Sequence, residues 1–178
     1  MKPLSILIIA FTAYLFSRSR EYNPDTGWAE YADSTYTSGS PFSMTGGTEY
    51  TLPNNAQRIR DSQKPPDVDS FFNRTDTTIT GRNGDGLNVF IYFKGRPSTA
   101  TATYIDVSID IGGGVGQLYQ RTITFPKGNG VETGVSLSFA GFTLDTWESN
   151  GGKVKVTANA NLDVYNIVYI LTRTSKAR

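Results

Sequence analysis

Apolar and polar side chains alternate along most of the chain after Arg20, with the period of two that is typical of β-strands. The pattern is clearest at residues 104–111, where aliphatic side chains alternate with Asp and Ser. Turn-forming residues separate such stretches, and residues 54–69 are expected to be a loop. We expect strands at residues 28–31, 49–52, 87–94, 104–111, 118–125, 135–139, 142–147, 154–158 and 163–174.

No stretch after Arg20 carries capped apolar residues at helical spacing. Short strands with turn signals about every 8–12 residues are typical of a sandwich or jelly roll. We therefore predict an all-β fold, a jelly-roll sandwich, in one domain that spans residues 21–178. Residues 1–20 are expected to be a separate hydrophobic N-terminal arm or anchor.

The C-terminal segment, residues 163–174, is apolar on both faces of a would-be strand. A strand of this kind must be covered on both sides. As the closing strand of a jelly roll, it is expected in the middle of a sheet. We expect a second copy of the chain to cover one face; a central strand under long loops is the alternative. The side chains expected at this contact are Tyr165, Ile167, Tyr169 and Leu171, whereas Val164, Val168 and Ile170 lie on the opposite face.

The segment of residues 4–16 is a nearly uninterrupted apolar run between Lys2 and Arg18. A secretory signal and a mis-assigned start codon are two interpretations of it. A membrane span is disfavoured, because crossing about 30 Å of hydrocarbon takes roughly 20 apolar residues. We favour an arm that docks on another protein. The apolar side chains expected to make this contact, with a groove of another protein or with the arms of other copies, are Leu4, Ile6, Ile8, Phe11 and Leu15.

Composition narrows the possible chemistry. The 178-residue chain carries a net charge of +1 and has no histidine and no cysteine, which excludes catalytic triads, imidazole or thiolate metal sites and disulfides. Scattered basic residues give no electrostatic footprint for nucleic acid.

Asp106 and Asp110 lie about 13 Å apart on a strand, too far for a glycosidase pair. Asp67 and Asp69 lie in a Pro-rich loop with nothing evident to fix them. We therefore expect no enzyme, cofactor or metal site.

Aromatic residues are the remaining candidates for binding. Tyr22, Tyr31, Tyr36 and Phe42 are expected to be exposed, either to stack on sugars or to pack at an interface, although packing at strand ends is commoner. Trp28 and Trp147 are expected to anchor the core or a contact between subunits.

Several motifs together resemble the small tumour-necrosis-factor-like jelly-roll proteins of tailed bacteriophages, particularly marine and cyanobacterial ones. The resemblance covers roughly residues 25–174 and consists of strand and turn patterns. The motifs are WAEYAD at 28–33 with Tyr36 and Ser40-Pro41, Ile79-Thr80, Gly84-Asp85 before 87–93, RTITFPKG at 121–128, NGG at 150–152 and YNIVYI at 165–170.

The resemblance implies a non-enzymatic, homotrimeric virion protein on the capsid surface, of the head decoration (cement), spike or fibre type. Its partners would be itself and the major capsid protein or another virion protein, with no nucleic acid and no membrane. The alternative is a receptor- or glycan-binding knob of a phage spike or tail fibre, or a membrane-tethered surface lectin. The apolar segment of residues 4–16 differs from the N-terminal sequence that the resemblance leads us to expect.

Overall fold

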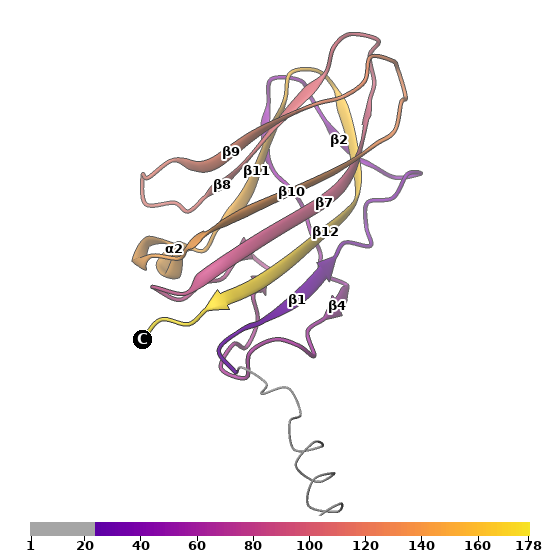
Figure 1. The fold of residues 1–178 in the computed structure, drawn as a ribbon. Helices are drawn as coiled ribbons and strands as arrows, with labels where there is room; N and C mark the ends of the chain where they lie inside the picture. Colours follow the sequence, from indigo (N-terminus) through magenta and orange to yellow (C-terminus); the bar gives the residue numbers. More distant parts are fainter. Residues whose placement is uncertain (1–23) are drawn as a thin grey trace, which may run out of the picture.

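Two antiparallel β-sheets face each other in the computed structural model, which describes residues 24–178 (Figure 1). The larger sheet has six strands in the order β10-β7-β12-β1-β4, and β2 also pairs with β12. Its strands are β1 (Gly27–Ala32), β2 (Phe42–Met44), β4 (Arg58–Arg60), β7 (Gly86–Pro97), β10 (Thr133–Phe142) and β12 (Leu162–Ser175). The all-β sandwich expected from the sequence is therefore confirmed.

The smaller sheet has four strands in the order β3-β11-β8-β9, and β5 and β6 form a separate two-stranded ribbon. Its strands are β3 (Glu49–Thr51), β8 (Tyr104–Asp110), β9 (Gln117–Thr124) and β11 (Lys153–Ala158), and the ribbon consists of β5 (Phe72–Asn73) and β6 (Thr78–Ile79). Alternation in β8 is as expected: Ile105, Val107 and Ile109 are completely buried. They meet inward-facing residues of the larger sheet, because burying both apolar faces drives the two layers together.

β12 lies in the middle of the larger sheet, between β7 and β1 (Figure 1). It pairs with β1 from Gly27↔Arg173 to Ala32↔Val168 and with β7 along almost its whole length. The mid-sheet position expected for the C-terminal segment is thus confirmed.

One predicted strand is wrong. The stretch 142–147 ends β10 and then enters a short helix, α2 (Asp145–Asn150). Asp145 and Glu148 lie in its first turn, where acidic side chains favour a helix, and Gly151 ends it with a φ of 71°. Trp147 packs into the core from this helix and donates a hydrogen bond from Nε1 to the Ile79 carbonyl at 2.9 Å. The apolar surface of Trp147 is buried, as it would be in a strand, which explains why the apolar pattern predicted a strand at residues 142–147.

The aromatic residues also differ from expectation. Tyr31 is buried rather than exposed, and its hydroxyl accepts a hydrogen bond from the Phe71 N–H at 2.9 Å. Tyr36 and Phe42 are half-buried and pack against each other edge to face. Trp147 is a core residue, whereas Trp28 remains 38% exposed on the larger sheet. Tyr22 lies outside the described residues.

Candidate functional site

A β-bulge in β12 decides which side chains the larger sheet presents to solvent. Tyr165 is opposite Lys94 and Val168 is opposite Tyr92, so two residues of β12 stand against one residue of β7. Asn166 takes the extra position with a φ of 53°, a conformation that Asn tolerates better than most residues. The strand therefore changes face here, which a strict period of two does not anticipate.

This bulge corrects the predicted contact between copies. Ile167, Tyr169 and Leu171 point into the core of the single chain and are at most 1% exposed. The Tyr169 hydroxyl donates a hydrogen bond to the Leu52 carbonyl at 2.8 Å. Side chains buried in this way have no surface left for a second copy, so these three residues cannot form the predicted contact.

Tyr165 lies beyond the bulge, on the outer face, although it is only 1% exposed. Its hydroxyl donates a hydrogen bond to Glu132, and the Arg96 guanidinium lies 5.6 Å from its ring centre. Burial, reinforced by the hydrogen bond to Glu132, raises the pKa of Tyr165 to about 12. The ring is covered by its own chain, so it too is not available as predicted.

The outer face of the larger sheet instead carries a group of apolar side chains, with the carboxylate residue Glu30 of β1 opposite Ile170. Register pairs Phe90 with Ile170 and Tyr92 with Val168, and Trp28 lies opposite the adjacent Thr172. We call Trp28, Phe90, Tyr92, Val168 and Ile170 the outer patch; each is half-buried or exposed.

The surroundings of the outer patch leave it open. On β10 its neighbours are the short side chains Ser136 and Ser138, which do not screen the rings of Tyr92 and Phe90. The one helix within residues 24–178, α2, lies at an end of the sandwich rather than over this face (Figure 1). Apolar groups gathered on an open sheet face are typical of an interaction surface.

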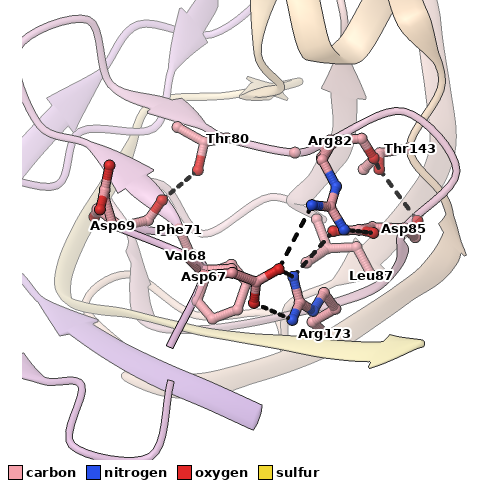
Figure 2. A pocket seen from close by; sticks show the side chains of 12 residues that line it. Asp67, Val68, Asp69, Phe71, Thr80, Arg82, Asp85, Leu87, Thr143 and Arg173 are labelled. Atoms are coloured by element: carbon pink, nitrogen blue, oxygen red, sulfur yellow. Dashed lines mark hydrogen bonds and ion pairs between the residues drawn. The ribbon is translucent and has the colours of Figure 1, made fainter. Parts of the chain in front are cut away.

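A second feature is a cavity of about 330 Å³ at the end of the sandwich that holds the C-terminus. Figure 2 shows Asp67, Asp85, Arg82 and Arg173 converging on one side of it. Phe71, Leu87 and Val68 supply apolar walls.

Arg173 is the centre of this cluster and is 1% exposed, although it carries a full charge. Its Nη2 lies 2.6 Å from Asp67, and its Nη1 contacts both Asp67 at 3.2 Å and Asp85 at 3.4 Å. The Nε and Nη2 groups also donate to the carbonyls of Asp25 and Pro24. All five N–H donors of the guanidinium are thereby used, so its burial is compensated. Arg173 fixes the start of the described chain to the end of β12.

Asp67 is held firmly, contrary to the expectation of a loose loop carboxylate. Besides Arg173, it contacts Lys176 at 3.0 Å and Arg82 at 3.5 Å. Hydrogen bonds from Arg173 and, to a lesser extent, Lys176 hold the pKa of Asp67 far below its usual range. A carboxylate stabilised in this way is a poor general base, because catalysis needs a pKa near the working pH. The cluster is therefore suited to holding chain segments together.

Acid should weaken this cluster. The pKa of Asp67 is lower in the folded chain than in the unfolded chain, so the unfolded chain is protonated at this residue first as the pH falls. The stabilisation of the folded state is therefore complete above about pH 4 and falls as the pH drops further. We expect Asp67→Asn to melt below the wild type at pH 7 and the difference to shrink towards pH 2 in thermal melts. The control is Asp69→Asn, which removes a nearby carboxylate with no ion pair within residues 24–178. A constant difference for Asp67→Asn across this range would contradict the assignment.

The predicted attachment residues Leu4, Ile6, Ile8, Phe11 and Leu15 lie outside the described residues. Within residues 24–178, no helix has the length and apolar character needed to cross a membrane.

Comparisons with known proteins agree with the fold. The structure of Eiger TNF from S. frugiperda superposes with a TM-score of 0.56 at 10% sequence identity, covering 86% of this chain and 96% of that one. PRD1 vertex protein P5 matches with a TM-score of 0.43 at 14% identity, over 85% of this chain and 73% of that one. No family model and no curated protein sequence matches the chain. The fold is therefore a jelly roll similar to that of Eiger TNF, and at this identity the similarity establishes the fold alone.

Proposed function

We propose that this chain is a non-enzymatic structural protein of a virus particle, a homotrimer that decorates the outside of the capsid. The outer patch is the observation that carries the proposal, because a trimer would cover this apolar sheet face, which is open in the single chain. The motif resemblance to tumour-necrosis-factor-like phage virion proteins supports the same conclusion. The jelly-roll fold is compatible with it.

A closed ring of three copies needs two different surfaces on each copy, one for each neighbour. The outer patch is the first. The second candidate is an edge patch at the side of the sandwich, formed by Tyr119, Phe142 and Leu144, which are 37%, 66% and 58% exposed. Contacts between outer patch and edge patch would close the ring with both surfaces buried.

The arm at residues 4–16 supplies the proposed attachment to the capsid. An arm that binds the assembled shell and not free subunits stabilises the shell by mass action. Three arms on one trimer bind together, so weak individual contacts become strong through avidity. Arg173 anchors the chain at Pro24 and Asp25, which gives the arm a fixed point of departure.

Removing residues 2–20 is expected to leave a folded, soluble trimer that no longer binds particles lacking this protein. Ile8→Asp should act almost as severely, because an unpaired buried carboxylate costs several kcal/mol. Co-sedimentation with such particles measures the effect, and liposome flotation of the full-length chain is the control. Flotation with lipid alone, or full binding by the truncated trimer, would contradict the arm.

The aromatic residues give little support to the alternative of a receptor- or glycan-binding knob. Tyr36, Phe42 and Tyr50 pack edge to face, with ring centres 5.3 and 5.4 Å apart, and they rest against the core. Rings used in this way offer little free face for stacking on a sugar.

A further inference from the structure

The strand β4 forms an open edge of the larger sheet. It pairs with β1 alone, through Glu30↔Arg60, Tyr31↔Ile59 and Ala32↔Arg58, and it ends the strand order (Figure 1). All three of its residues are exposed. Its second edge therefore presents backbone donors and acceptors that an extended chain could pair with.

The two faces of β4 differ in chemistry. Arg58 and Arg60 lie on the outer face, whereas Ile59 lies on the same side as Tyr31. Ile59 is 48% exposed and borders a hollow of about 380 Å³. The hollow is lined by Tyr31, Ala56, Ile59, Phe72 and Arg74, among others.

The arginines around this edge are poorly neutralised. Arg60 contacts Glu30 at 3.6 Å with a side chain that is 77% exposed, a pairing worth little in water. Within residues 24–178, Arg58 and Arg74 have no carboxylate partner. Two copies of the strand Arg58–Arg60 would repel each other, so a second copy is a poor occupant of this edge. An acidic partner would gain from the same charges.

We propose that the β4 edge receives an extended acidic segment of another protein by strand addition. Main-chain hydrogen bonds to β4 supply the pairing, and alternate side chains supply selectivity. Acidic side chains on one face of the added strand meet Arg58 and Arg60. Apolar side chains on its other face enter the hollow beside Ile59, with Arg74 at the rim. This surface is additional to the outer patch and does not depend on trimer formation.

A peptide with a dye at its N-terminus, tetramethylrhodamine-Gly-Glu-Val-Glu-Val-Glu-Gly-amide, is a suitable probe with the full-length protein. We expect fluorescence anisotropy to show binding that weakens with added salt, and hydrogen exchange to slow at Arg58–Arg60. The double variant Arg58→Glu with Arg60→Glu should bind about tenfold more weakly, because each exposed charge pair contributes a factor of up to about five. The matched control is Arg121→Glu with Lys127→Glu, which makes the same change of net charge on and just after β9 and should bind as the wild type does.

Any one of the following results would overturn the proposal. The first is no binding of the peptide by the wild type at millimolar concentration. The second is equal binding of a peptide with Lys in place of Glu, or an unchanged affinity of the Arg58→Glu, Arg60→Glu variant. The third is a change in the mass of the assembly in that variant, which would place these arginines in contacts between copies.

Discussion

Replacing Arg173 with methionine is expected to lower the free energy of unfolding by about 3–5 kcal/mol, because it removes one member of a buried ion cluster. Asp85, whose side chain is 8% exposed, would lose its buried cation and keep the partly exposed Arg82 at 3.1 Å and a hydrogen bond from the Ala177 N–H at 2.8 Å. The carbonyls of Pro24 and Asp25 would also lose their donor. This loss is a large fraction of the 5–15 kcal/mol that typically stabilises a domain. Chemical denaturation followed by tryptophan fluorescence measures it.

The control for this variant is Arg121→Met, which removes an exposed arginine that has no ion pair within residues 24–178. It should change the free energy of unfolding by less than about 0.5 kcal/mol. Equal stabilities for the Arg173 and Arg121 variants would show that the cluster contributes nothing to the fold.

Adjacent residues of β12 are expected to give opposite results when each is replaced by aspartate. Ile170→Asp should leave the protomer folded and dissociate the proposed trimer, because it removes about 1.5–3 kcal/mol of apolar burial at each contact and adds a desolvated charge. Tyr169→Asp should instead unfold the protomer, because this side chain is 1% exposed in the core. Light scattering reports the assembly and circular dichroism reports the fold.

Val115→Asp is the matched control, since Val115 is 52% exposed and lies away from the outer patch in the turn between β8 and β9. It should leave both the mass and the fold unchanged. A trimer that survives Ile170→Asp would place the contact elsewhere on the molecule.

Sequence reasoning predicted the longer strands well, because alternation of side chains and glycine-rich turns are local properties. It missed the short strands β2, β4, β5 and β6, and β4 lies within residues 54–69, which were expected to be a loop. It identified both apolar faces of β12 and its position in mid-sheet, yet it assigned the faces wrongly. The cause is one residue, Asn166, whose left-handed φ of 53° inserts a bulge and reverses the alternation. An Asn between apolar residues was the available signal, although it does not by itself distinguish a bulge from a regular strand.

The polar cluster could not have been predicted, because its members are distant in the chain. Asp67 and Arg173 are 106 residues apart and meet only after β12 has entered the sheet. An arginine among the apolar residues of a central strand was a signal that a partner must exist, but not which one. The helix α2 was missed for a different reason: six residues with one buried tryptophan are too few to establish a period.

The mass of the assembly in solution tests the proposed trimer most directly. Multi-angle light scattering of the full-length protein at micromolar concentration should give three times the 19.5 kDa of the chain. A monodisperse species of 19.5 kDa would contradict the trimer and would leave the outer patch without the partner proposed for it.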